Sequence, residues 1–179
     1  MDTTRPHQEA VTRIMNQIHE PSVAALLVGK TSRANELGIR LTLDQDSVLR
    51  EESPWLPPNA YVTVLGNLIE NAIEGLNQSL RGTKQITVSI REDESGLLLC
   101  VEDTGPGIPA DLRRRLFQRG ATSKGEGRGT GLSLVQEVVT TYHGTIRVES
   151  DAGVGTSFFI HFRREDLPNA EEEFNCIRS

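Results

Sequence analysis

The chain has 179 residues, of which 36% are hydrophobic and 25% charged, a composition typical of one globular domain with a sizeable core. Its net charge of −6 comes without a basic stripe and only 4% of its residues are aromatic, so no nucleic-acid partner is expected. Its longest apolar runs, at residues 24–28 and 97–101, fall well short of the roughly 18 to 20 residues that cross a bilayer, so no direct membrane contact is expected. Cys100 and Cys176 are the only cysteines, which indicates neither a disulfide framework nor a metal cluster and fits a reduced cytoplasm.

The first half of the chain is predicted to be mainly helical. Residues 1–20 carry apolar side chains at helical spacing and are expected to form a short amphipathic lead-in segment, the remnant of a dimerisation helix or a linker. A second helix is predicted from Pro21 to Gly38, followed by a strand over 39–43. A polar loop then leads to Pro58, where a long helix running to about Leu80 begins, because proline is tolerated in a first turn.

The second half is predicted to contain two hairpins separated by a glycine-rich stretch. Strands over 86–91 and 97–103 are joined by a turn-like segment, and strands over 145–149 and 157–162 form the second hairpin. Between them we expect a short helix over 110–117 and a longer one over 130–142 that ends at Gly144. The acidic residues 165–179 have little to bury and are predicted to be a mobile tail, so the folded domain is expected to span 21–164.

The helix beginning at Pro58 separates its side chains into two opposite arcs at about 100° per residue. The amides and carboxyls of one arc are Asn67, Glu70, Asn71 and Glu74, and the apolar arc contains Val62, Leu65, Ile69, Ala72, Ile73 and Leu76. Taken alone, this pattern is typical of a surface helix with a solvated face. It becomes a candidate site only together with the two loops that follow.

The first loop, residues 103–109, reads Asp-Thr-Gly-Pro-Gly-Ile-Pro and comes directly after an apolar strand. A carboxylate emerging there can accept a hydrogen bond from an exocyclic amine. Gly105 and Gly107 would let the backbone approach a flat ring closely. The structural alternative is an ordinary glycine-proline turn.

The second loop is the glycine cluster of residues 125–131, which runs straight into a predicted helix. Successive backbone N–H groups and the helix N-terminus can hold phosphate oxygens, and Lys124 and Arg128 would supply positive charge beside them. A flexible loop followed by a helix cap is the structural alternative.

These motifs, in this order and spacing, resemble the N, G1, F and G2 boxes of sensor histidine kinases: residues 67–72, 103–108, 116–117 and 129–134. Residues 153–158 are similar to the closing hairpin of the same ATP-binding domain, and residues 21–39 resemble the lead-in of the citrate and C4-dicarboxylate sensor subgroup. The resemblance implies the Bergerat-type fold of the GHKL superfamily. This is a two-layer α/β sandwich with a mixed, mostly antiparallel sheet, helices on one face and an ATP lid.

By this resemblance, ATP and Mg²⁺ are the cofactors, and catalysis would involve Asn71, Glu70 and Lys124. The amide oxygen of Asn71 would coordinate Mg²⁺, with Asn67 and Glu70 supporting the metal and the phosphates. Asp103 would select adenine with help from Thr156. The remaining nucleotide contacts would come from Gly105, Gly107, Ile108, Lys124, Arg128, Gly129, Thr130, Gly131 and Leu132, with Leu116 and Phe117 anchoring the lid.

Position 67 distinguishes between members of the superfamily. Related chaperones and topoisomerases carry a glutamate there that can activate water, whereas Asn67 disfavours hydrolysis and favours transfer of the γ-phosphoryl group to a separate acceptor. The implied acceptor is a histidine on a dimerisation domain that is missing here, and it would pass the phosphoryl group to a response regulator. The domain would be cytoplasmic and its parent bound in the bacterial inner membrane.

Two questions stay open, the cation that contacts the phosphates and an alternative function. Many family members carry a lysine where this chain has Glu74, so a different cation, Lys124 or Arg128, would have to contact the phosphates. An anti-sigma-type binding protein has the same nucleotide fold and is the alternative function.

Overall fold

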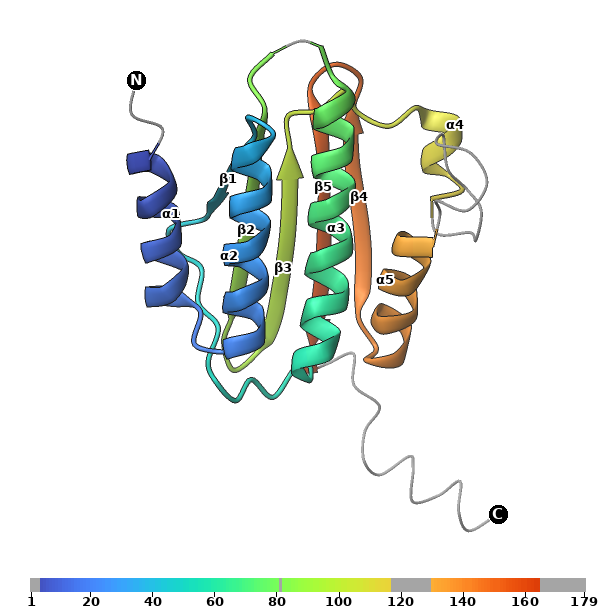
Figure 1. Cartoon of the computed structure of the whole chain (residues 1–179). Helices are drawn as coiled ribbons and strands as arrows, with labels where there is room; N and C mark the ends of the chain where they lie inside the picture. Colours follow the sequence, from blue (N-terminus) through green and yellow to red (C-terminus); the bar gives the residue numbers. More distant parts are fainter. Residues whose placement is uncertain (1–3, 81, 117–129, 165–179) are drawn as a thin grey trace, which may run out of the picture.

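The computed structural model describes residues 4–80, 82–116 and 130–164. Within them, a five-stranded sheet is covered on one face by helices, which confirms the predicted two-layer α/β sandwich (Figure 1). The strand order is β1-β2-β3-β5-β4, with β1 parallel to β2 and every other pair antiparallel. The strands are β1 (Arg40–Leu43), β2 (Gln85–Glu92), β3 (Gly96–Asp103), β4 (Thr145–Asp151) and β5 (Gly155–Arg163).

The helices are α1 (Thr4–Gln17), α2 (Pro21–Glu36), α3 (Pro58–Gln78), α4 (Ala110–Arg113) and α5 (Thr130–Thr141). α4 is shorter than the predicted helix, because residues 114–116 form a turn after it. Phe117 and the predicted tail lie outside the described residues. In the part of the chain that the structure describes, no helix is both long and apolar enough to cross a membrane.

α3 lies between α2 and α5 with the sheet behind it, so its buried surface is wider than the predicted apolar arc (Figure 1). Tyr61, Val64 and Leu68 are each at most 1% exposed although they lie outside that arc. Val62, which the arc included, is only half-buried. The predicted arc differs from the buried surface because a single helical period assumes one covered face, whereas α3 has neighbours on three sides.

The loop before α3 is polar in composition but contributes buried apolar side chains to the core. Leu49 and Leu56 are buried, and Leu49 pairs with Ile18 beyond α1 in an isolated parallel bridge. Ile14 and Ile18 belong to the same hydrophobic core as the sheet and α3. The lead-in segment therefore packs as part of the core within the described residues.

Candidate functional site

Asn67 is positioned by its own helix and touches the start of α5. Its Nδ2 donates a hydrogen bond of 2.6 Å to the carbonyl of Thr63 one turn earlier, which leaves Oδ1 facing α5. A Cβ atom added to Gly131 would lie 2.8 Å from that oxygen, so α5 can approach α3 this closely only because position 131 is glycine. The structure thus brings together the two predicted motifs that contain Asn67 and Gly131.

Glu70 faces the other neighbour of α3. Its carboxylate lies 2.6 Å from Lys30 Nζ and 3.1 Å from Arg33 Nη2, both on α2. Burial alone would raise the pKa of Glu70, but the hydrogen bond and charge of Lys30, together with those of Arg33, hold this pKa below its ordinary value. The residue next to Asn71 therefore ties α3 to α2.

Replacing Glu70 by glutamine is expected to lower the free energy of unfolding at pH 7 by about 1 kcal/mol, because the half-buried ion pairs are lost. The pKa of Glu70 is depressed in the folded state, so its stabilisation is present above the unfolded pKa and fades as pH falls through the folded one. Urea unfolding at several pH values measures this. Glu94→Gln, at an exposed turn, is the matched control, and equal stability of the two variants at pH 7 would contradict the assignment.

Asp103 ends β3 beneath the C-terminal half of α3. Its Oδ1 accepts a hydrogen bond of 2.8 Å from the backbone N–H of Gly105, and a Cβ atom on that glycine would lie 2.7 Å from Oδ1 and 3.8 Å from Leu76. Burial raises the pKa of Asp103, while the backbone N–H groups of Gly105 and Thr156 partly oppose the rise. A half-buried carboxylate beside a glycine, which has no side chain, is suited to accept a hydrogen bond from a flat, amine-bearing ring.

The loop after Asp103 packs on the turn between β4 and β5. Gly107 has a φ of +79°, and a Cβ atom there would lie 2.5 Å from the carbonyl oxygen of Asp151. Next to it, the backbone N–H of Ile108 donates to Ser150 Oγ at 2.7 Å. The loop of residues 103–109 is therefore held against the second hairpin by contacts that leave no room for a side chain at position 107.

Ser150 is a site residue that sequence reasoning missed. It is buried, its hydroxyl lies 3.0 Å from that of Thr156, and its carbonyl accepts a hydrogen bond from Arg113 on α4. The hydroxyl of Thr156, which was predicted to assist Asp103, therefore contacts the hydroxyl of Ser150. The backbone N–H of Thr156 hydrogen-bonds the Asp103 carboxylate. Nothing in the sequence distinguishes Ser150 from any other serine in a strand, since its partners are distant along the chain.

The phosphate side of the site is described only in part. Leu132 is half-buried on α5, and Asn71 and Glu74 are half-buried on α3 near the pair formed by Asn67 and Gly131. Lys124, Arg128 and Gly129 lie outside the described residues, as does the side chain of Thr130. The described part of the candidate site is therefore the loop after Asp103 together with the polar side of α3.

The raised pKa of Asp103 predicts that binding of adenosine, which has no phosphate to titrate, weakens as pH falls. A protonated carboxyl is a poorer acceptor, and a raised pKa means that protonation begins at a higher pH than for an ordinary aspartate. Calorimetric titration of adenosine between pH 7.5 and pH 4.5, within the range where the fold is intact, measures this. Affinity that stays constant across the range would contradict the prediction.

Residues 57–166 match the family described as histidine kinase-, DNA gyrase B-, and HSP90-like ATPase. The chain belongs to this family, and the family implies that it binds ATP. Within the family, its relatives are sensor histidine kinases, and the chain is an ATP-binding catalytic domain of that kind. The motifs of the sequence predicted this membership.

The similar proteins are sensor kinases by name. The chain is 34% identical to a probable C4-dicarboxylate sensor kinase of Halalkalibacterium halodurans over 92% of its own length, and 37% identical to the sensor histidine kinase DcuS of Escherichia coli K12 over 89%. It is 34% identical to the sensor histidine kinase CitA of Klebsiella pneumoniae over 87% of its length. The chain spans about a third of each relative, at 31%, 29% and 28%.

Solved structures support the fold. The chain superimposes on the catalytic domain of histidine kinase ThkA with a TM-score of 0.64 and 22% identity, covering 82% of this chain and 94% of that one. Full-length ShkA in complex with AMPPNP gives a TM-score of 0.61 at 25% identity, covering 80% of this chain and 29% of that protein. The mixed sheet with helices on one face is thus the architecture of histidine kinase catalytic domains.

Proposed function

We propose that this domain binds Mg²⁺-ATP and transfers the γ-phosphoryl group to a histidine on a dimerisation domain, for relay to a response regulator. The carrying observation is the arrangement at α3. The Asp103 carboxylate and Gly105 lie under its C-terminal half, and Gly131 at the start of α5 touches Asn67 on its polar side. A nucleotide with its adenine at Asp103 would direct its phosphates toward Asn67 and Asn71.

The residues present suit this ligand. Asp103 accepts a hydrogen bond from the exocyclic amine of adenine, and Gly105, Gly107 and Ile108 form the wall of the ring pocket. The Asn71 amide offers an oxygen of the kind that Mg²⁺ prefers, and bound Mg²⁺ would neutralise phosphate charge. Lys124, Arg128, Gly129, Thr130, Gly131 and Leu132 complete the phosphate cradle in this proposal.

Asn67 favours transfer over hydrolysis. Its side chain is an amide that already donates to Thr63, so it has no basic group with which to activate water. Glu70 is engaged by two cations of α2, which favours a role in positioning Asn71 over direct contact with phosphate. The names of the relatives support a parent sensor kinase, and a location of that parent in the bacterial inner membrane is part of this proposal.

Asn71→Ala tests the magnesium assignment. The unmodified chain is expected to bind ATP more tightly with Mg²⁺ than without it, and this variant should lose about tenfold in affinity only when Mg²⁺ is present, because one metal ligand is gone. Calorimetric titration with and without Mg²⁺ measures both states. Asn77→Ala removes an exposed amide from the same helix and should behave like the parent chain.

Phosphate release and phosphoryl transfer separate the two possible reactions. The chain alone should release almost no phosphate, and labelled phosphoryl should appear on a histidine-bearing dimerisation domain of a similar sensor kinase supplied in trans. Rapid phosphate release by the chain alone would identify a hydrolysing ATPase. ATP binding with unchanged magnesium dependence in Asn71→Ala would remove that residue from the metal site.

A further inference from the structure

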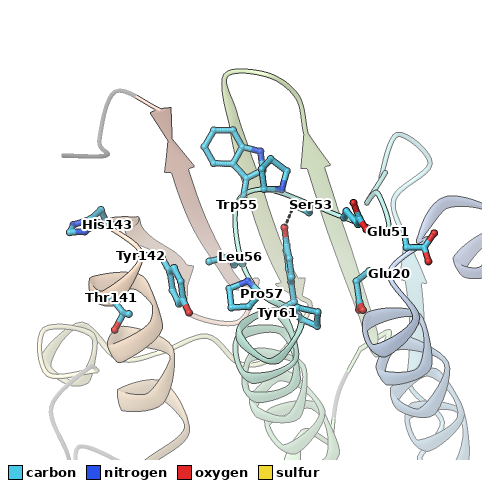
Figure 2. Close-up of a pocket in the computed structure, with 13 residues that line it drawn as sticks. Glu20, Glu51, Ser53, Trp55, Leu56, Pro57, Tyr61, Thr141, Tyr142 and His143 are labelled. Atoms are coloured by element: carbon cyan, nitrogen blue, oxygen red, sulfur yellow. Dashed lines mark hydrogen bonds between the residues drawn. The ribbon is translucent and has the colours of Figure 1, made fainter. Parts of the chain in front are cut away.

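A separate cavity of about 520 Å³ lies at the N-terminal end of α3, at the opposite end of the helix from Leu76 and Asp103 (Figure 2). Its walls come from the junction of α1 and α2, the loop before α3 and the C-terminal end of α5. The chain contains one tryptophan and two tyrosines, and all three line this cavity: Trp55, Tyr61 and Tyr142. In a chain with only 4% aromatic residues, this gathering singles the cavity out.

The lining of the cavity carries three carboxylates and the titratable His143, and Arg50, which is paired with Glu92, acts on Tyr61 from nearby. Glu20, Glu51 and Glu52 line the cavity, and its described lining contains no lysine or arginine. Figure 2 shows Glu20 and Glu51 on one side of Trp55 and Tyr61. Aromatic faces carry negative electrostatic potential, so rings beside carboxylates attract a cation.

Tyr61 is fixed in place by a chain of hydrogen bonds. Its hydroxyl lies 2.5 Å from Ser53 Oγ, and Ser53 donates its only hydroxyl hydrogen to Glu92 Oε2 at 2.8 Å, so Tyr61 must be the donor to Ser53. Burial raises the pKa of Tyr61, so the phenol stays neutral. The ring is therefore positioned before any ligand arrives.

Trp55 differs from Tyr61 because its polar atom has no partner among the residues that the structure describes. The indole Nε1 is buried and forms no hydrogen bond with any described residue. A buried donor without an acceptor is unfavourable, and a peptide carbonyl is an acceptor that would satisfy it. An inorganic cation alone would leave this donor unsatisfied.

We propose that the cavity binds a lysine or arginine side chain presented by a partner protein. The cation would lie between the aromatic rings and the carboxylates, and a backbone carbonyl of the partner would accept from Trp55 Nε1 once the indole ring turns to bring that buried atom to the surface. A peptide segment supplies both groups, which matches the charge of the cavity and its unpaired donor. Trp55 and Tyr142 are partly exposed, and partly exposed aromatic residues with a polar rim are typical of protein interfaces.

The only tryptophan of the chain makes the test direct, because intrinsic fluorescence reports on this cavity alone. The probe is the blocked tripeptide acetyl-Gly-Arg-Gly-amide, compared with the same peptide carrying neutral citrulline and with free guanidinium at equal ionic strength. The arginine peptide should change the tryptophan emission saturably, and calorimetry should confirm that it binds. Replacing its arginine by citrulline should weaken this binding at least about fivefold. Glu51→Gln/Glu52→Gln should weaken it similarly while ATP binding is unchanged.

Glu36→Gln/Glu94→Gln is the matched control, since it removes the same charge at exposed positions away from the cavity. Equal weakening by both double variants would reduce the effect to net charge and overturn the proposal. Equal binding of the citrulline peptide would overturn cation recognition. Free guanidinium binding as tightly as the peptide would identify a small-cation site instead of a protein contact, and no binding of any probe would refute the proposal outright.

Discussion

Replacing Asp103 by asparagine is expected to weaken ATP binding by at least about tenfold and to leave the unliganded domain as stable as before or more so. The asparagine amide would place its own N–H donors against the amine of adenine, which is also a donor. The charge-assisted hydrogen bond made by the aspartate would therefore be lost without replacement. Its oxygen can still accept from the N–H of Gly105, so the loop keeps its contact. Calorimetric titration of ATP and thermal unfolding of the unliganded protein measure the two effects.

The stability effect follows from the sign of the pKa shift. The folded-state pKa of Asp103 is raised above its unfolded value, so its contribution to stability is most favourable below the unfolded pKa and is lost as pH rises through the folded one. At neutral pH the ionised, half-buried carboxylate therefore opposes folding, and an uncharged amide removes that opposition. Glu102→Gln, the exposed neighbour on β3, should change neither property. A destabilised Asp103→Asn protein would show that the carboxylate is a structural group.

Replacing Gly107 by alanine is expected to lower the free energy of unfolding by about 3 kcal/mol and to abolish measurable ATP binding. A φ of +79° strains any residue with a Cβ atom by about 1–2 kcal/mol, and that atom would lie 2.5 Å from the carbonyl oxygen of Asp151. Relieving the clash moves the loop of residues 103–109 away from the second hairpin, at a further cost of roughly 1–3 kcal/mol. Denaturant unfolding and ATP titration measure both.

Gly153→Ala separates strain from collision. Gly153 has a φ of +75°, nearly that of Gly107, but no atom lies within 4 Å of where its Cβ would be. This variant should lose only the backbone strain, roughly 1–2 kcal/mol, and keep its nucleotide affinity. If the two alanine variants were equally stable, the close contact at Gly107 would have no energetic weight.

Most elements could be predicted because their signals are local. The proline that opens α3, the glycine that follows α2 and the alternation along the hairpin strands all act within a few residues. The parallel pairing of β1 with β2 and the burial of Leu68 could not be predicted in the same way. Both depend on segments that meet only after the chain has folded back across α3.

The same division applies to the candidate site. The glycines of both loops and the order of the motifs predicted the family, since close backbone approach requires glycine at positions that can be read from the sequence. The roles of Ser150 and Lys30 could not be predicted in this way, because they depend on the partners Ile108 and Glu70, which are 42 and 40 residues away. The roles of Lys124 and Arg128 stay predictions.

The pairing of Asp103 with Thr156 has a consequence for the order of folding. The two residues stand opposite each other in the sheet, yet they belong to different hairpins, β2–β3 and β4–β5. Each hairpin can form locally and early, whereas docking β3 on β5 must close a loop of more than fifty residues and is therefore slow. The proposed adenine pocket forms only after that docking, so ATP bound there should stabilise the last assembled state and slow unfolding more than it speeds folding.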